Sequence, residues 1–470
     1  MVRSSQNITD TIIRFMFSAT DQNIPLAVLL LIIVITIVLA CRKSYGKWLN
    51  PIAIISIWWG GWLAVAEINL IGIPAPSYYT SGIVVTTWIF CVFGALTGRK
   101  YQTFHPVNFS ATKINKRIAN YVGVCLLVIA GPIFWFSYLG LSIQSTLTDV
   151  ASYRTELFGS DSVIYSSKFN YYMYIFVITP LLFVCVLWLQ SRGFGKTKKE
   201  KWLAALVVLL VIAESLGTSG RLMVYFLVIG VVYCKIFRAH RLPNLTTSPS
   251  GAKAFIFPIL LIILLLWMNQ RRMSGNDLGV FDISAYFLVW YHTLGFSLLD
   301  LELNNSFSRL NDFPTLGQAS FGGLIDYFLV PLHPIIQYDP VAYLNAVSQE
   351  EFQIVGYSDL LGAPIPANAY YTVFYSIFQD FGWFGIVGVW FLYGRLLNRS
   401  YRKYIHYGNF SSLYLLNALI FCGMFGLFQS PLESHRFWVA VIFAYFISKI
   451  ESKRAGNING SILQSNQSRR

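Results

Sequence analysis

Long apolar runs recur along most of the chain and are separated by short polar segments. A helix needs about 20 apolar residues to cross the hydrocarbon core of a bilayer, and runs of this length favour helices over barrel strands. The pattern predicts an all-α integral membrane protein, a polytopic bundle of about 11 (11–13) transmembrane helices. The predicted spans are residues 24–41, 50–74, 81–98, 118–138, 171–190, 202–216, 222–237, 253–269, 373–394, 410–428 and 437–450.

Composition agrees with this pattern. Of the 470 residues, 55% are hydrophobic and only 12% are charged, whereas a soluble domain carries about 25% charged residues. A soluble protein would have too few polar groups to cover these continuous apolar stretches, so that class is excluded.

The net charge of +14 suggests nucleic acid as a partner until the positions of the charges are considered. Of the 35 Lys and Arg residues, 26 fall in one alternate set of segments between the predicted spans, including the C-terminal tail, and 9 in the other set. This asymmetry is typical of the positive-inside pattern of membrane proteins. It predicts a periplasmic N-terminus, a cytoplasmic C-terminus and no role for nucleic acid.

The largest predicted external segment is residues 270–372, which holds ten Asp and Glu but three Lys and Arg. Apolar stretches at 282–303 and 318–338 allow two interpretations. They are two further spans, or they are amphipathic helices of an external loop that pack over the membrane mouth, which the acidic composition favours. The expected organisation is helices 1–8 in 1–269, a large periplasmic loop in 270–372, and helices 9–11 with a cytoplasmic tail in 373–470.

Basic residues are scarce on the predicted outer face, and those that occur there are arginines near membrane boundaries: Arg154, Arg221, Arg271, Arg272 and Arg436. Interfacial anchoring explains any one of them. Taken together, they suggest a site for an anionic group at headgroup depth. The planar guanidinium suits a diphosphate because it forms bidentate, charge-assisted hydrogen bonds.

The stretch "GTSGR" at 217–221 adds small residues whose backbone could approach a phosphate closely. Glu214 lies seven residues before Arg221, on nearly the same helical face. This carboxylate either orients an arginine or acts as a base, with a structural ion pair favoured. His435, beside Arg436, is a candidate base because a neutral imidazole accepts a hydroxyl proton; a packing role explains it equally well.

Other patterns point to structure. Gly382, Gly385 and Gly388 are spaced three apart and predict close helix packing on one face. All six cysteines fall inside apolar runs, which predicts buried packing residues rather than a disulfide framework or zinc site. The sequence contains no convincing Walker, GxGxxG, HExxH or GxSxG motif. We therefore expect neither a metal site nor a cofactor.

Four motifs resemble the bacterial oligosaccharide repeat-unit polymerases, which include the O-antigen polymerases. They are "SYRTELFG", "GTSGRLMVYFLVIG", "NQRRMSG" and "NAYYTVFYSIFQDFGWFGIVG", and the resemblance covers roughly residues 120–450. Each motif is weak alone, and their order and topology carry the resemblance. One departure is that the Arg-x10-Gly pattern of some members is absent here.

The resemblance implies a glycosyltransferase acting on the periplasmic face of the inner membrane, in the biosynthesis of lipopolysaccharide or a related surface polysaccharide. Such enzymes transfer a growing glycan from undecaprenyl diphosphate to a hydroxyl of another lipid-linked repeat unit. Arginines could stabilise the diphosphate leaving group without a metal, and one base would take the hydroxyl proton. The expected partners are undecaprenyl-diphosphate-linked oligosaccharides, membrane lipids and a polysaccharide chain-length regulator.

Three alternatives remain. An O-antigen ligase would pass the glycan to lipid A core instead. A flippase or exporter of lipid-linked oligosaccharide should show a polar path across the membrane and often internal repeats, whereas the intramembrane charges here are sparse and near one side. A lipid-phosphate-sugar glycosyltransferase commonly has acidic residues in its first external loop, and "PAPSYYT" has none.

Overall fold

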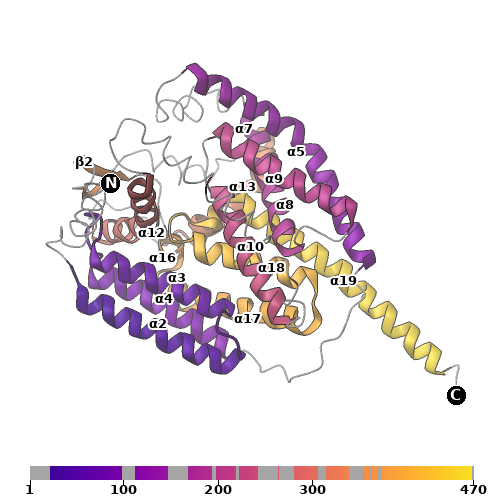
Figure 1. Ribbon diagram of the computed structural model, residues 1–470, viewed down its shortest axis with the longest axis horizontal. Helices are drawn as coiled ribbons and strands as arrows, with labels where there is room; N and C mark the ends of the chain where they lie inside the picture. Colours follow the sequence, from indigo (N-terminus) through magenta and orange to yellow (C-terminus); the bar gives the residue numbers. More distant parts are fainter. Residues whose placement is uncertain are drawn as a thin grey trace, which may run out of the picture. The chain divides into compact units, whose positions relative to one another are not determined.

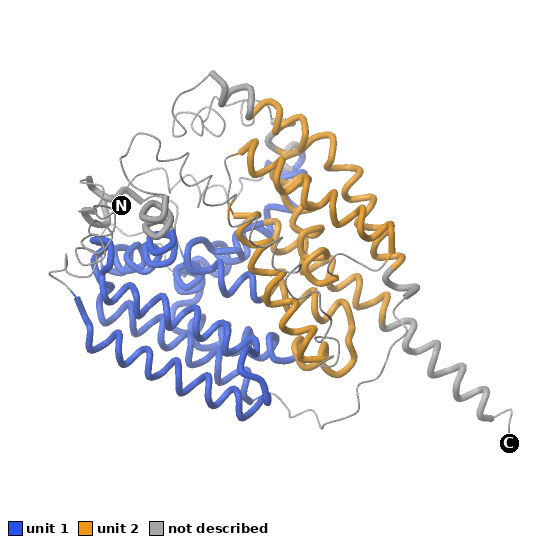
Figure 2. Tube along the Cα trace, in the orientation of Figure 1, with its two compact units in different colours: residues 1–99, 277–399, 420–434 blue, residues 100–276, 400–419, 435–470 orange. Residues whose placement is uncertain are grey.

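The computed structural model describes residues 22–97, 112–146, 168–192, 197–218, 222–241, 263, 280–304, 314–337, 353–358, 363–367 and 372–467. The chain forms two compact units, each built from separate stretches of sequence (Figure 2). Unit 1 comprises residues 1–99, 277–399 and 420–434, and unit 2 comprises 100–276, 400–419 and 435–470. Two of the boundaries between the units fall inside helices, one in α17 (Trp390–Tyr407) and one in α18 (Phe410–Phe425).

Seven described helices are long and apolar enough to cross a membrane, and each coincides with a predicted span. They are Ile24–Tyr45, Pro51–Ile68, Tyr78–Leu96, Lys116–Gly140, Met173–Arg192, Lys198–Thr218 and Leu222–Arg241. The expectation of a helical membrane protein is confirmed to this extent. The predicted span 253–269 lies outside the described residues except Ile263. The total of about 11 stays a prediction.

In unit 1, helices α2 (Ile24–Tyr45), α3 (Pro51–Ile68) and α4 (Tyr78–Leu96) lie side by side (Figure 1). Helix α3 begins where Pro51 fixes the first turn and the Asn50 side chain accepts a hydrogen bond from the Ala53 backbone N–H at 3.0 Å. The backbone N–H of Asn23 donates to the Glu67 carbonyl at 2.9 Å, so α2 starts beside the end of α3. Helices α2 and α3 are therefore antiparallel.

The remaining elements of unit 1 come from the predicted loop and the last third of the chain. They are α12 (Val280–Asn304), α13 (Gln318–Leu329), η4 (Val330–Leu332), α14 (His333–Ile336), α16 (Val373–Phe384), η5 (Gly385–Val389) and η6 (Pro431–Glu433), with strands β1 (Gln353–Ser358) and β2 (Ala363–Ala367). Strands β1 and β2 form one short antiparallel pair among these helices. Helix α13 has 12 residues, which corresponds to about 18 Å, and η4 and α14 follow it directly up to Ile336. Both interpretations of 318–338 stay predictions.

The predicted span 373–394 is not a continuous α-helix. Gly382 has φ 54° and ψ −140°, a conformation that interrupts the helix and that favours glycine. Gly385 packs against the Ile377 carbonyl, and nothing lies within 4 Å of the position of a Cβ on Gly388. The prediction of three glycines on one packing face is therefore wrong, because one of them breaks the helix and another faces open space.

Close backbone contact instead joins α4 to the first half of α17. A Cβ on Gly94 would lie 2.0 Å from the Phe391 carbonyl oxygen, and a Cβ on Gly394 would lie 1.9 Å from that of Cys91. The amide of Asn398 donates to the Ala95 carbonyl at 2.7 Å in the same region. These two helices approach so closely because each presents a glycine to the backbone of the other.

Unit 2 contains α5 (Thr112–Thr146), α7 (Lys168–Tyr172), the π-helix η1 (Met173–Ile178), α8 (Thr179–Arg192), α9 (Lys198–Thr218), α10 (Leu222–Arg241) and α19 (His435–Gln467). Helix α5 packs along α9, and α8 contacts α5, α10 and α19. At the centre, Gln190 donates to the Phe226 carbonyl at 2.9 Å and accepts from the Asn417 amide at 2.6 Å. Tyr233 donates to the Asn417 side chain, so the buried polar groups pair with one another.

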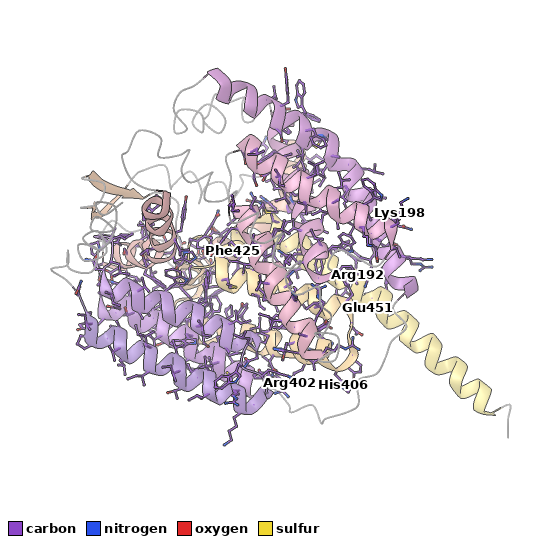
Figure 3. The ribbon with its side chains drawn as sticks, in the orientation of Figure 1. Arg192, Lys198, Arg402, His406, Phe425 and Glu451 are labelled. Carbon is purple, nitrogen blue, oxygen red and sulfur yellow. The ribbon has the colours of Figure 1, made fainter. Side chains whose placement is uncertain are left out.

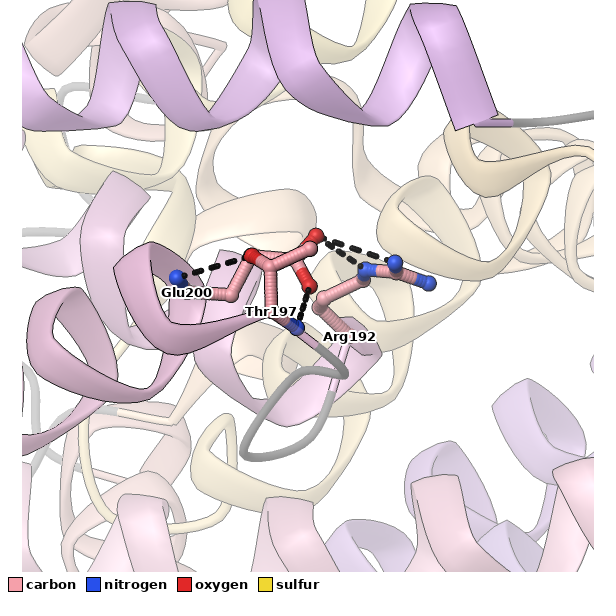
Figure 4. Close-up of polar contacts among 3 residues, drawn as sticks. All are labelled: Arg192, Thr197 and Glu200. Atoms are coloured by element: carbon pink, nitrogen blue, oxygen red, sulfur yellow. Dashed lines mark hydrogen bonds and ion pairs between the residues drawn. The ribbon is translucent and has the colours of Figure 1, made fainter.

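Several charged groups of unit 2 lie at one end of its helices, including Arg192, Lys198, Arg402 and Glu451 (Figure 3). Arg192 forms a 2.9 Å ion pair with Glu200, which completes a capping box with Thr197 at the start of α9 (Figure 4). This end carries the segments that the positive-inside pattern assigns to the cytoplasm.

The tight contact between α4 and α17 predicts the effect of one methyl group. Gly94→Ala should lower the free energy of unfolding by about 1–3 kcal/mol, since the new Cβ would overlap a backbone oxygen. The matched control is Gly82→Ala on the same helix, where nothing lies within 4 Å; it should be neutral or stabilising by up to about 1 kcal/mol. Unfolding of the purified variants in detergent measures both, and equal stability of the two would contradict the packing.

The charge pattern predicts topology. In a cysteine-free background, cysteines at Asn304 and Ser348 should react with a membrane-impermeant thiol reagent in intact spheroplasts. A cysteine at Lys199 should react only after lysis, because its segment belongs to the basic, cytoplasmic set. The reverse pattern of labelling would show that the orientation is inverted.

Candidate functional site

Three of the predicted site residues come together at one end of unit 2. Glu214 lies near the end of α9, and His435 and Arg436 are the first two residues of α19. The Arg436 charge is the one that acts on the Glu214 carboxylate, so the two residues are close despite 221 intervening positions. This end of α9 lies opposite its Glu200 end.

Arg221, Arg154, Arg271 and Arg272 lie outside the described residues. Arg221 immediately precedes Leu222, the first residue of α10. Their proposed roles stay predictions from the sequence.

Glu214 is held from several sides. The residue is 9% exposed, and its Oε1 accepts a hydrogen bond from the Tyr174 hydroxyl at 2.9 Å. Tyr174 in turn packs against Phe136 of α5. A buried carboxylate needs such donors because burial without hydrogen bonds is costly. The site therefore fixes the direction of this side chain.

The π-helix η1 places one aromatic side chain against Glu214 and another against His435. Tyr174 reaches Glu214, and Phe176 lies against the His435 imidazole, with ring centroids 4.5 Å apart and planes inclined by 51°. π-Helices are rare and often occur at functional sites. Neither contact is detectable from the sequence, because Tyr174 and Phe176 look like ordinary members of an apolar run.

Gly217 has a different role from the predicted one. A Cβ at this position would lie 2.5 Å from Cα of Ser137 on α5, and Ser137 donates to the Ala213 carbonyl at 2.8 Å. The first glycine of "GTSGR" therefore allows α5 and α9 to pack closely and does not make room for a phosphate. Its position inside α9, rather than in a turn, explains the difference.

Arg436 has no ionic partner among the residues that the structure describes. Among the described residues, the one ion pair with an N–O distance within 4.0 Å is Arg192–Glu200. Arg436 is half-buried and is not hydrogen-bonded to any group in the described part of the chain. A guanidinium in this state is able to bind an incoming anion through its fork of N–H donors.

The environment of His435 favours a neutral imidazole. Burial, and secondarily the positive charge of Arg436, lower the pKa of His435 from 6.5 to about 4. Near neutral pH this residue is a hydrogen-bonding group and a weak proton acceptor.

Within the described ranges, no three His, Cys, Asp or Glu side chains gather as a metal-ligand set. The six cysteines are free thiols, five of them buried and Cys125 partly exposed, in agreement with the predicted packing role. The chemistry available to the described cluster is thus charge neutralisation, hydrogen bonding and proton transfer. The chain matches no protein-family model, no curated protein and no solved structure.

Proposed function

We propose that the chain is a glycosyltransferase that polymerises undecaprenyl-diphosphate-linked oligosaccharide repeat units on the periplasmic face of the bacterial inner membrane. The observation that supports this best is the Arg436 guanidinium, half-buried and without an ion pair among the described residues, next to the oriented carboxylate of Glu214. A lipid diphosphate is an anion that arrives at headgroup depth. A fixed guanidinium there would stabilise it as a leaving group.

In this proposal, Arg436 and Arg221 bind the diphosphate, and Arg154, Arg271 and Arg272 contribute from the external segments. Glu214 keeps an arginine correctly directed rather than neutralising it. The neutral His435 hydrogen-bonds a sugar hydroxyl or a phosphate oxygen. The oriented charges would be worth more here than in water, because the surroundings are apolar and preorganised.

Deletion of the gene followed by gel analysis of lipopolysaccharide tests the function. A polymerase mutant should show single repeat units attached to lipid A core. Bare core with polymer accumulated on undecaprenyl diphosphate would identify a ligase instead.

The proposed diphosphate contact predicts that lysine cannot replace arginine at position 436. Arg436→Lys should impair polymerisation strongly although the protein is inserted, because lysine keeps the charge but loses the bidentate fork. Arg436→Ala should be worse, by about 10²–10³ in rate, and Arg221 should behave likewise. Arg192→Lys, at the other end of unit 2, is the control and should retain activity. Normal chain lengths in Arg436→Ala would reduce this residue to an anchor.

The arginine-based mechanism also predicts that no divalent metal is required, because guanidinium groups neutralise the diphosphate. The purified protein should extend lipid-linked repeats in the presence of EDTA at its normal rate. Loss of activity that Mg²⁺ or Mn²⁺ restores would argue against this mechanism.

A further inference from the structure

A second carboxylate, which no sequence motif marks, lies in unit 1 on the short element η6. Glu433 is half-buried, and its carboxylate accepts a hydrogen bond from the Ser376 hydroxyl of α16. Its backbone is fixed as well, since a Cβ on Gly323 of α13 would lie 2.4 Å from the Glu433 carbonyl oxygen. Both the main chain and the side chain of this residue are therefore held, while part of it remains accessible.

Asp380, one turn after Ser376 on α16, acts electrostatically on the Glu433 carboxylate. Its Oδ1 accepts from the Thr315 hydroxyl at 2.6 Å and the Ala319 N–H at 2.9 Å, and its Oδ2 accepts from the Ser320 N–H at 2.6 Å. This carboxylate is completely buried and caps the start of α13. It is thus a structural group whose negative charge lies near Glu433.

The two carboxylates have different surroundings and are suited to different tasks. Burial is the main reason that the pKa of Glu433 rises from 4.5 to about 7, and the Asp380 charge adds to the rise. Hydrogen bonds from Ser376 and Ser430 act in the opposite direction. On α13, the titratable residue nearest to Gly323 in sequence is Asp326. A carboxylate whose pKa lies near neutral pH is suited to accept a proton from a substrate.

We propose that Glu433 is the proton acceptor for the attacking sugar hydroxyl, an inference that rests on the proposed polymerase function. The hydroxyl oxygen forms a bond with the anomeric carbon of the donor glycan as the bond from that carbon to the diphosphate oxygen breaks. The leaving diphosphate takes the bonding electron pair, and the hydroxyl proton passes to the Glu433 carboxylate. The substrate from which Glu433 takes the proton is therefore a lipid-linked sugar acceptor.

Glu433 suits this task better than His435, two residues later in the sequence. A base with a pKa near the operating pH combines a large ionised fraction with useful proton affinity. Glu433 meets this condition at about 7, whereas His435 at about 4 has little affinity for a proton at neutral pH.

The test is the initial rate of chain extension by the full-length protein in nanodiscs between about pH 5.5 and 8.5, with purified lipid-linked repeats as substrate. The wild-type rate should rise with pH through about 7 as the Glu433 carboxylate loses its proton. Glu433→Gln should reduce the rate by about 10²–10⁴-fold and abolish this rise.

Ser376→Ala gives a second readout that does not depend on removing the base. Its hydroxyl stabilises the charged carboxylate, so its loss should raise the pKa of Glu433 further and move the rise in rate to higher pH. The rate at the alkaline plateau should stay near the wild-type value. If Glu433→Gln is not produced in folded form, the direction in which the pH–rate profile of Ser376→Ala shifts tests the role of Glu433 by itself.

The matched control is Glu67→Gln, because Glu67 is a buried carboxylate of unit 1 that likewise accepts a hydrogen bond from a serine, Ser81. It should retain the wild-type pH profile. A wild-type rate and profile in Glu433→Gln, or an unshifted profile in Ser376→Ala, would overturn the role of Glu433 while leaving the polymerase function intact. Failure of the wild-type protein to extend any lipid-linked repeat would instead overturn the polymerase function itself.

Discussion

In a protein surrounded by hydrocarbon, every backbone N–H and C=O group must find a partner within the protein, and helix ends are where partners are lacking. This chain supplies them from distant positions. Asp300 accepts hydrogen bonds at the start of α4, and Glu451 accepts from the Phe410 and Ser411 N–H groups at the start of α18. A negative charge at a helix N-terminus also complements the helix dipole.

The backbone groups at the C-terminal end of α18 also need hydrogen-bond partners. The carbonyls of its last turn accept hydrogen bonds from two indole N–H groups of α3, Trp59 to Gly423 at 2.6 Å and Trp58 to Met424 at 2.8 Å. The N–H of Val373 then donates to the Gly426 carbonyl at 2.7 Å. Backbone groups at the end of α18 and at the start of α16, which would be costly to leave unpaired in lipid, are thus satisfied by side chains and backbone of the same unit.

Function, in our proposal, uses the polar groups that remain after these structural needs are met. Asp380 is committed to the start of α13, and Glu200 to a capping box and an ion pair. Arg436 has no ion pair within the described residues, and Glu433 keeps an affinity for a proton near neutral pH. The residue type of a charged group therefore does not show whether it has a structural role or is available to a substrate. Its hydrogen-bond and ionic partners do.

The apolar runs and the asymmetry of basic residues determined that this is a helical membrane protein and where seven of its candidate spans lie. Length and hydropathy suffice for that, because lipid acts on each span separately. The sequence also singled out Glu214, His435 and Arg436. Only the tertiary structure decided that Tyr174 holds Glu214, that Gly382 breaks a helix and that Ser376 meets Glu433. Contacts between side chains from different helices depend on how the helices pack, which hydrophobic periodicity leaves undetermined.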